Sequence, residues 1–456
     1  MALSKKNFYF LNLGCAKNLV EGEHLAGMLI DGGYRFTSHI SQADWLLVNT
    51  CGFLTSAIEE NIDHILDLAS RKKNSQKLVV IGCLVGRFGK KLKTSLPEVD
   101  LFVSPGQAAN LLELMAAIPE SAMAFSPATG LLNSPRALST GPSWAYLRLG
   151  DGCLHNCSFC AIPHIRGKLR SRALPDLVNE ARSLAQSGIK ELNLVAQDVS
   201  SYGQDLNMTH GLLGLLRELD KIDNLQWIRL LYLYPDIITE EFLREINSFN
   251  RVLPYFDIPL QHIADPVLKA MGRPHSEAGL RHNLGLIRRI IPQAVVRTTF
   301  LVGHPGEGEE EFNNLLQFVE EFKFDRLGCF AFEPQQGTRS YLMPQIPARI
   351  ARARQKKLMA LQKKISRQLL RQLKGSCQPM LFLGEHPESP LLGIGRLWSQ
   401  APEADGEVIV VDGGARPGDI VSAKILKTHA YDLEATLCVA SQQLLRNCPL
   451  PPGTNI

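Results

Sequence analysis

The chain has 456 residues, 45% of them apolar and 21% charged, and a net charge of +4. This length predicts two or three domains, and the composition is ordinary for a globular protein in water. No stretch approaches about 18 uncharged apolar residues, which excludes a membrane-spanning helix, and the start of the chain lacks the cleavage site of a signal peptide. Ten cysteines without a secretion signal indicate the reducing cytoplasm, where clustered thiols bind metals or act in catalysis rather than form disulfides.

Residues 5–120 alternate strand and helix patterns, with helix-like stretches at residues 23–30 and 57–69. Three short apolar runs that predict strands are each followed by a cysteine: Phe8–Leu13 by Cys15, Trp45–Val48 by Cys51, and Leu78–Ile81 by Cys83. Alternating strands and helices predict a parallel sheet, and the strand ends of such a sheet share one edge. The three cysteines are therefore expected to lie together and to bind a metal cluster. The alternative is three unrelated buried cysteines, because free cysteine is among the most buried residue types.

Residues 121–142 are rich in Ser, Pro, Ala and Gly, which predicts a linker. Residues 143–346 then resume the alternation, with six predicted strands: Ala145–Leu149, Glu191–Val195, Trp227–Leu233, Tyr255–Ile258, Val295–Val302 and Arg326–Phe332. Six strands joined by crossover helices predict a parallel barrel, complete or partial, with its active site at the carboxyl ends of the strands. Gln197 follows the second strand and Gly303 the fifth, so both are expected on that face. Gly303 and Gly306 allow a ligand to approach the backbone closely, although such a turn by itself is more often only a tight turn.

Directly after the first of these strands, Cys153, Cys157 and Cys160 place three thiols within eight residues. Thiolates are soft ligands that suit zinc or iron–sulfur clusters. Four would close a zinc site or an ordinary 4Fe–4S site, whereas three leave one coordination position open for chemistry. The alternative is a zinc knuckle that takes His155 or a remote histidine as its fourth ligand. Zinc cysteines usually come as C-x2-C pairs, so the spacing favours a cluster.

Residues 347–374 carry ten Lys and Arg and no acid, and their apolar residues recur mostly every three or four positions, which predicts an amphipathic helix. Without these ten, 39 of the 49 basic residues remain against 45 acidic residues, a net charge of −6. The helix presents either a solvated face packed against the barrel or a contact for RNA or an acidic surface. We favour the first interpretation, because a charged stripe on one helix is not a groove.

Residues 376–445 contain short strands separated by Gly and Pro turns and predict a small barrel of about five strands. This segment has four bases and nine acids, a net charge of −5. An acidic barrel is a poor phosphate binder and a good dock for a basic protein. Residues 446–456 predict a disordered tail. Four cysteines belong to no group and are assigned no role: Cys329, Cys377, Cys438 and Cys448.

The spacing of Cys153, Cys157 and Cys160 is the signature of radical S-adenosylmethionine (SAM) enzymes, and nearly the whole chain resembles their methylthiotransferase family. That family joins an N-terminal three-cysteine domain, a radical SAM barrel and a C-terminal TRAM barrel. Five motifs carry the resemblance: Gly14–Asn18, Asn49–Phe53, Ile162–Gly167, Gln197–Gly203 and Asp257–His262. They resemble the branch that modifies a ribosomal protein rather than the transfer-RNA branch. Two motifs depart from the family pattern: Val20–Glu23 replaces Val-Asp-Ser-Glu, and His304 replaces Phe in Gly303–Gly306.

The resemblance implies an α/β fold with two 4Fe–4S clusters. The cluster that cleaves SAM would be held by Cys153, Cys157 and Cys160, with Phe159, Gln197 and Gly303 as SAM contacts. An auxiliary cluster that carries the sulfur would be held by Cys15, Cys51 and Cys83. One SAM would methylate that sulfur, and a second would give the radical that takes a hydrogen from the β-carbon of an aspartate on the twelfth protein of the small ribosomal subunit. No side chain is assigned a catalytic role, since the chemistry belongs to the cofactors.

The implied partners are that ribosomal protein and an external one-electron reductant. We expect a cytoplasmic monomer with no membrane contact and no primary contact with nucleic acid. The predicted domains are the cluster-binding domain at 5–120, a linker at 121–142, the radical SAM core at 143–375, the TRAM domain at 376–445 and a tail at 446–456. Three alternatives stay open: transfer RNA as the substrate, a non-catalytic iron–sulfur protein, and a colourless zinc-stapled scaffold.

Overall fold

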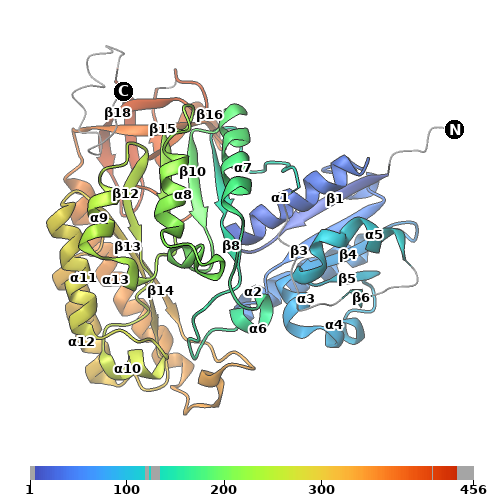
Figure 1. Cartoon of the computed structure of the whole chain (residues 1–456), viewed down its shortest axis with the longest axis horizontal. Coiled ribbons are helices and arrows are strands. Elements are labelled where there is room, and N and C mark those ends of the chain that lie inside the picture. Colours follow the sequence, from blue (N-terminus) through green and yellow to red (C-terminus); the bar gives the residue numbers. More distant parts are fainter. Residues whose placement is uncertain (1–5, 119–122, 125–133, 413, 439–456) are drawn as a thin grey trace. The chain divides into compact units, whose positions relative to one another are not determined.

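The computed structural model describes residues 6–118, 123–124, 134–412 and 414–438 (Figure 1). The chain divides into two compact units. The first unit consists of Met1–Ser139, Arg148–Arg172 and Gln335–Thr338, and the second of Thr140–Leu147, Ala173–Pro334 and Arg339–Ile456. The predicted tail at 446–456 lies outside the described residues. No helix in the described part of the chain is long and apolar enough to cross a membrane.

The first unit is built on a six-stranded parallel sheet in the order β2-β1-β3-β4-β5-β6. Its strands, in blue and blue-green in Figure 1, are β1 (Asn7–Asn12), β2 (Arg35–Phe36), β3 (Trp45–Thr50), β4 (Lys77–Gly82), β5 (Leu101–Val103) and β6 (Met123–Ala124). The three strands predicted from the apolar runs correspond to β1, β3 and β4, which are neighbours in the sheet. The parallel βα organisation predicted for this part of the chain is confirmed.

Helices cover both faces of this sheet, because successive side chains of a strand point to opposite faces. Leu47 of β3 packs in one core cluster with Leu25 of α1, and its neighbour Leu46 packs in the other with Ile65 of α2. The helices of this unit are α1 (Ala16–Asp31), α2 (Thr55–Arg71), α3 (Cys83–Phe88), α4 (Lys90–Ser95) and α5 (Leu111–Ala116), with short 3-10 helices η1 (Ile40–Gln42) and η2 (Pro105–Asn110). The sheet is therefore buried on both sides, as its continuous apolar runs indicate.

The predicted linker contributes to the first unit where it is described. The strand β6 falls within it and extends the sheet. Further along, Glu23 of α1 accepts hydrogen bonds from the guanidinium of Arg136 and from the N–H of Ser139, the latter at 2.7 Å. This buried ion pair ties the described part of the segment to α1, and its assignment as a linker stays a prediction.

The first unit also contains Arg148–Arg172, which includes the segment with three closely spaced cysteines. This segment forms a two-stranded antiparallel pair, β8 (Gly150–Asp151) with β9 (Arg170–Ser171), and the short helix α6 (Ile162–Arg166). Helix α6 packs against α3, where Gly86 leaves room: a Cβ on it would lie 3.2 Å from Ile165 O. The predicted domain boundary at residue 143 assigned this segment to the core instead, and the domain boundaries stay predictions.

The second unit contains a six-stranded sheet in chain order, β7-β10-β11-β12-β13-β14. Its strands are β7 (Trp144–Arg148), β10 (Glu191–Val195), β11 (Trp227–Leu230), β12 (Val252–Asp257), β13 (Val295–Val302) and β14 (Arg326–Ala331). All six predicted strands are found, and β10 to β14 pair in parallel. The sheet is open, with β7 and β14 as its edges, so the predicted barrel is a partial one.

Helices connect these strands, in green and yellow in Figure 1. They are α7 (Leu174–Gln186), α8 (Gly211–Leu219), α9 (Glu240–Ile246), α10 (Asp265–Ala270), α11 (Glu277–Ile290) and α12 (Glu309–Phe322), with 3-10 helices η3 (Val199–Ser201), η4 (Gln204–Leu206), η5 (Pro235–Ile237) and η6 (Arg339–Leu342). The predicted basic helix is α13 (Ala348–Arg371). Its buried face includes Leu358 and Ile365, and Gln362 donates to Phe324 O at 2.9 Å. The amphipathic helix is thus confirmed, packed beside β14.

The C-terminal strands form a closed barrel in the order β15-β16-β17-β19-β18. They are β15 (Cys377–His386), β16 (Ser389–Leu397), β17 (Val408–Val410), β18 (Ile420–Thr428) and β19 (Leu433–Leu437), and they confirm the small barrel. A buried ion network fixes the barrel to the six-stranded sheet of the same unit. Arg396 of β16 and Arg229 of β11 both bind the carboxylate of Glu191 in β10, at 2.5 and 3.0 Å.

Candidate metal centre

Cys15, Cys51 and Cys83, called here the first trio, lie close together beyond the ends of β1, β3 and β4. Gly14 precedes Cys15, and a Cβ on Gly14 would lie 2.9 Å from the Cβ of Cys51. Gly52 follows Cys51, and a Cβ on Gly52 would lie 2.7 Å from the backbone of Cys83. The expectation that these cysteines converge on one edge is met, because the carboxyl ends of adjacent parallel strands meet there.

Gly82, the last residue of β4, turns the chain so that α3 can begin at Cys83. Its φ is +101°, a conformation that residues with a side chain rarely adopt. A Cβ on it would lie 2.6 Å from Asn49 Oδ1 and 2.8 Å from Thr50 O. Both the backbone angle and the space around it therefore require glycine, and the position of Cys83 depends on this turn.

Cys153, Cys157 and Cys160, the second trio, lie on the loop between β8 and α6. The N–H of Cys160 donates to Cys157 O at 3.2 Å, and the N–H of His155 donates to Cys153 Sγ at 3.4 Å. The thiols of Cys157 and Cys153 both act electrostatically on Cys160. The three sulfurs thus share one neighbourhood, as their spacing in sequence predicts.

The two trios adjoin each other within the first unit. Cys83 packs with Ala161 and Ile165 in a small buried cluster, and Ala161 directly follows Cys160. The positive charge of Lys17, at the start of α1, acts on Cys15 in one trio and on Cys160 in the other. One compact body of the protein therefore carries all six cysteines.

A buried arginine links the two trios. Arg166, the last residue of α6, is 1% exposed, and its Nε and Nη2 donate to Cys83 Sγ at 3.2 and 3.1 Å. Its guanidinium also forms a bidentate pair with Glu21 at 2.9 and 2.8 Å and bonds Asp151 at 3.2 Å. Burial lowers the pKa of Arg166, but the charges of Asp151, Cys83 and Glu21 outweigh it and hold that pKa well above its usual value. The group stays cationic beside the Cys83 sulfur.

A second buried arginine balances the carboxylates. Arg148 binds Asp151 at 2.7 Å and lies 3.7 Å from Glu21. Burial raises the pKa of Asp151, but the charges of Arg148 and Arg166 lower it overall. Two arginines and two carboxylates thus form a neutral buried group, which is the arrangement in which buried charges are tolerated. Of the two arginines, Arg166 is the one with hydrogen bonds to Cys83.

Asn18 of α1 fixes the ends of two strands beside the first trio. Its Nδ2 donates to Thr50 O at 2.8 Å and to Leu13 O at 3.3 Å, and its Oδ1 accepts from Arg166 Nη2 at 2.9 Å. Cys83 Sγ lies 3.7 Å from the same Oδ1. Because the amide is buried and its donors and acceptor are used, it holds the backbone before Cys15 and Cys51 in one geometry.

The thiols of the two trios have different pKa values. Burial raises the pKa of Cys83 and of Cys160 to about 12 and also raises that of Cys51. Cys15 keeps exposed surface, yet many protein atoms surround it, so desolvation raises the pKa of its thiol. The charge of Lys17 and the N–H of Asn18 outweigh this and lower the pKa overall. A bound metal deprotonates a coordinating thiol whatever its starting value.

The donor chemistry of both trios suits iron–sulfur clusters. Each offers three thiolates, the soft ligands that hold such clusters. In the described part of the chain, no group of three or more Cys, His, Asp or Glu is arranged to hold a single metal ion. A cluster of four irons separates its cysteine sulfurs more widely than one ion does. Cluster ligation by these six residues therefore fits the site and stays a prediction.

The residues predicted to contact SAM lie in both units. Phe159 is half-buried on the loop of the second trio, in the first unit. Gln197 follows β10 and Gly303 follows β13, in the second unit, so both lie beyond strand ends as expected. The SAM contacts stay predictions for all three.

The structure explains the glycine at position 303 by packing, whereas the sequence suggested the close approach of a ligand. The φ of Gly303 is +78°, and a Cβ on it would lie 2.3 Å from the Cβ of Ala351 in α13. Its N–H donates to Glu307 Oε2 at 2.7 Å. Packing of α13 and the turn geometry thus account for this glycine without a ligand.

The two departures from the family pattern have local explanations. His304 is fully buried, with Nδ1 2.9 Å from Pro305 O and Nε2 2.7 Å from Ser340 Oγ. Burial lowers its pKa to about 4, so its ring is neutral and takes the place of the usual phenylalanine. Gly22 has no space for the usual serine, because a Cβ would lie 2.7 Å from Asn12 Oδ1.

Sequence reasoning did not single out Arg166, Asn18, Glu21 or Asp151. Arg166 and Asn18 stand inside motifs that the family shares, and Asp151 stands two residues before Cys153. Glu21 could have been found because it departs from the aspartate that is usual at this position. In the structure, both oxygens of its longer side chain accept hydrogen bonds from the guanidinium of Arg166.

Three family models match consecutive parts of the chain. Residues 7–104 match the family described as uncharacterized protein family UPF0004, residues 147–319 match the radical SAM superfamily, and residues 378–438 match the TRAM domain. The predicted order of a three-cysteine domain, a radical SAM core and a TRAM barrel is therefore confirmed.

Curated relatives match over nearly the full length. The ribosomal protein uS12 methylthiotransferase RimO of Syntrophobacter fumaroxidans is 44% identical over 443 residues, covering 96% of this chain and 99% of the relative. The protein of the same name from Geotalea uraniireducens is 43% identical over 437 residues, covering 94% and 98%. Among solved structures, the radical S-adenosylmethionine methyltransferase TsrM from Kitasatospora setae, with cobalamin and a 4Fe–4S cluster bound, aligns with a TM-score of 0.55 at 15% identity, over 82% of this chain and 81% of that one. At this identity the likeness concerns the fold alone.

Proposed function

The chain belongs to the RimO family of ribosomal protein uS12 methylthiotransferases, and from this membership we propose that it attaches a methylthio group to the β-carbon of an aspartate in that ribosomal protein. The observation that carries the proposal is the junction of two cysteine trios in one compact unit, where Cys83 of the first packs against Ala161 beside the second. Inserting sulfur at an unactivated carbon needs both a sulfur source and a radical source. Two adjoining sites provide a place for each.

Cys153, Cys157 and Cys160 hold one 4Fe–4S cluster, and Cys15, Cys51 and Cys83 hold the auxiliary one. Phe159, Gln197 and Gly303 contact SAM. When bound, the first cluster with SAM supplies the radical chemistry, and the auxiliary cluster supplies the sulfur. Three cysteines in each trio leave a coordination position for a non-protein ligand, which a catalytic metal site requires.

The protein's own contribution at this site is charge and position. Arg166 donates to Cys83 Sγ and keeps a cation beside the ligand sulfurs of the auxiliary cluster. Hydrogen bonds to cluster sulfurs and local charge set the reduction potential of such clusters. Because Arg166 also bonds Asp151, two residues before Cys153, it holds the second trio against the first. We assign Arg166 the role of a positioning residue.

The surface charge of the TRAM barrel supports a basic protein as the substrate. Of its four bases, Arg396 is buried against Glu191 and Lys427 is paired with Glu434. Five of its acids are exposed: Glu385, Glu388, Glu403, Asp412 and Asp419. Three of its bases are exposed as well, Arg416, Lys424 and Lys427. The exposed charge is therefore acidic, as the composition indicates, which favours docking of a basic ribosomal protein over the phosphates of transfer RNA. We further propose a cytoplasmic monomer that receives single electrons from an external reductant.

The test is anaerobic iron and sulfide content, SAM cleavage and methylthiolation of purified uS12, measured together. We expect about eight irons per wild-type chain, as two 4Fe–4S clusters require. The Cys153→Ala, Cys157→Ala, Cys160→Ala triple variant keeps about four irons and loses SAM cleavage. The Cys15→Ala, Cys51→Ala, Cys83→Ala triple variant also keeps about four and retains cleavage, but inserts no sulfur.

The control is Cys329→Ala, which removes a buried cysteine outside both trios and leaves all three readouts unchanged. A wild-type chain with about four irons would leave the first trio as structural cysteines. Sulfur insertion by the first-trio variant would refute the two-cluster assignment directly.

A further inference from the structure

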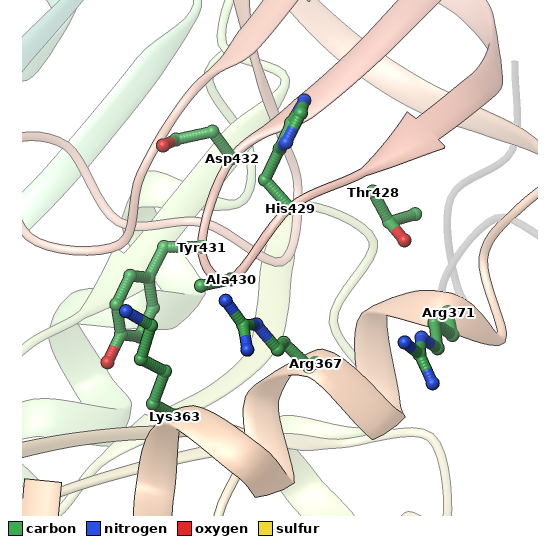
Figure 2. Close-up of a pocket in the computed structure, with 8 residues that line it drawn as sticks. All are labelled: Lys363, Arg367, Arg371, Thr428, His429, Ala430, Tyr431 and Asp432. Atoms are coloured by element: carbon green, nitrogen blue, oxygen red, sulfur yellow. The ribbon is translucent and has the colours of Figure 1, made fainter. Parts of the chain in front are cut away.

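A basic notch lies in the second unit between α13 and the turn that joins β18 to β19. It has a volume of about 480 Å³ and is lined by Lys363, Arg367, Arg371, Thr428, His429, Ala430, Tyr431 and Asp432. Figure 2 shows Lys363 and Arg367 projecting from the helix toward the turn, with Arg371 farther along the same helix. The notch exists because Ser366 Oγ donates to Ala430 O at 2.6 Å, which fixes the turn over the helix. Its size falls in the range of sites that take organic ligands rather than single ions.

The three cations recur every fourth residue along α13. Residues four apart lie on the same face of a helix and are separated by about 6 Å along its axis. Lys363, Arg367 and Arg371 are all exposed, and in the described part of the chain none of them forms an ion pair. Arg354 on the same helix differs, since it is buried and binds Glu307 and Glu309. The notch therefore offers a row of available positive charges.

The acids near the notch do not neutralise this row. Asp432 Oδ1 accepts the N–H of Glu407 at 3.2 Å, and Figure 2 shows its carboxylate pointing away from α13. Glu434 is bound by Lys427 at 2.8 Å and by His429 at 2.9 Å. An anionic ligand in the notch thus meets three cations and one carboxylate among the lining residues, that of Asp432, so the notch keeps a net positive charge.

The notch also contains an aromatic side chain. Tyr431 is half-buried on the turn, and Arg367 acts on it electrostatically. Single-stranded nucleic acids bind where a row of cations follows the phosphates and an aromatic ring stacks on a base. Regularly spaced cations beside a tyrosine match that chemistry better than they match an acidic peptide, which has no planar base to stack.

We propose that this notch binds a single-stranded segment of RNA, with Lys363, Arg367 and Arg371 on successive phosphates and Tyr431 against a base. The inference deepens the proposed function and rests on it, because a ribosomal protein is surrounded by ribosomal RNA when its subunit is assembled. The acidic barrel faces the basic protein and the basic notch faces the RNA, so the enzyme recognises uS12 within the small subunit. The RNA contact is secondary to the protein contact.

The test compares two triple variants of the full-length holoenzyme with the same change of charge on the same helix. The notch variant is Lys363→Gln, Arg367→Gln, Arg371→Gln, and the control is Arg349→Gln, Arg352→Gln, Lys356→Gln, whose residues are exposed and do not line the notch. The probes are a fluorescent 12-nucleotide polyuridine strand and purified small ribosomal subunits. Binding is measured by anisotropy and by sedimentation across a range of salt concentrations.

We expect the notch variant to bind both probes at least tenfold more weakly than wild type. The slope of its log affinity against log salt concentration should become shallower by about 2. Each phosphate contact on a single strand contributes about 0.7 to this slope, and the variant loses three contacts. The control should keep the wild-type slope. Tyr431→Leu should weaken polyuridine binding about fivefold or more without changing the slope, because it removes stacking and no charge.

Equal weakening in both triple variants would show general attraction and overturn the proposal. Loss of binding to a polyglutamate peptide in the notch variant, with RNA binding unchanged, would assign the notch to an acidic protein instead. Methylthiolation of free uS12 separates this inference from the proposed function. The notch variant should modify the free protein normally and the assembled subunit poorly, whereas a wild-type enzyme inactive on both would refute the function itself.

Discussion

Arg166 and Cys83 stand 83 positions apart in the sequence, and the guanidinium of one donates two hydrogen bonds to the sulfur of the other, at 3.2 and 3.1 Å. The arginine is buried, so its charge acts on the sulfur through a medium that screens it poorly. The same side chain binds Glu21 and Asp151, which anchors it between the two trios. If Cys83 ligates the auxiliary cluster as proposed, a cation in this position stabilises added negative charge on that cluster.

Arg166→Gln should therefore lower the reduction potential of the auxiliary cluster, by roughly 60 mV or more, which corresponds to a tenfold change in a one-electron equilibrium. The measurement is a redox titration followed by electron paramagnetic resonance, in chains that also carry the three alanines of the second trio. The variant should also lose about 3–5 kcal/mol of stability, because buried carboxylates lose a partner.

Arg148→Gln is the matched control, since Arg148 binds the same two carboxylates but is not hydrogen-bonded to Cys83. It should lose comparable stability and keep the potential. If both variants shift the potential equally, the hydrogen bonds to Cys83 do not set it.

Gly82→Ala should destabilise the first unit and deplete the auxiliary iron. The added Cβ would meet Asn49 Oδ1 at 2.6 Å in a residue whose φ is +101°, so strain and overlap together should cost about 3 kcal/mol or more. Gly33→Ala is the control, with a similar φ of +87° but nothing within 4 Å of the added Cβ, and it should cost only about 1 kcal/mol. Thermal unfolding and iron content check this pair, and equal losses would contradict the packing argument.

Cys377 and Cys438 should form a disulfide when the protein is treated with glutathione disulfide. Their sulfurs lie 3.1 Å apart, at the start of β15 and just after β19. The two thiols would be oxidised and one glutathione disulfide reduced to two glutathione thiols. Closing a loop of this length should stabilise the barrel by about 4 kcal/mol.

Peptide mapping without reductant checks the cross-link, and unfolding with and without dithiothreitol checks the gain. Cys377→Ser should abolish both, whereas Cys329→Ala should change neither. A mixed disulfide with glutathione at both cysteines, in place of the cross-link, would show that the pair cannot close.

Acid should destabilise the second unit through two buried histidines. Burial lowers the pKa of His262 to about 3 and that of His304 to about 4, from 6.5. The unfolded chain therefore binds protons that the folded chain does not. Stability that is present above pH 6.5 is lost as the pH falls toward the pKa values of the two histidines in the folded chain. Burial raises the pKa of Glu307 to about 7, which acts in the opposite direction between pH 4.5 and 7.

His262→Asn isolates one contribution, since the asparagine oxygen can accept the N–H of Ala264 as His262 Nδ1 does at 3.1 Å. Between pH 7 and 5 the wild type should lose about 2 kcal/mol more than this variant. Urea unfolding at the two pH values measures the difference, and identical pH dependence in both proteins would exclude His262 as the acid-sensitive group.

The sequence by itself determined most of the secondary-structure elements and the positions of the cysteines at the strand ends. Apolar runs predicted β1, β3 and β4 and all six strands of the second sheet, because continuous apolar runs mark strands buried on both faces. Convergence of the first trio followed from topology alone, since parallel strands end at one edge. The short strands β2, β5 and β6 were missed, because two or three residues give no pattern that stands out from a loop.

Only the tertiary structure decided what surrounds the cysteines. The bonds of Arg166 to Glu21 and Cys83, the pairing of Cys377 with Cys438, and the absence of ion pairs around Lys363 in the described residues all depend on which helices pack together. Such contacts join residues far apart in the sequence, and their energies come from burial and side-chain geometry that no local pattern records. The sequence thus determined which residues can do the chemistry, and packing decided the charge and the neighbours with which they do it.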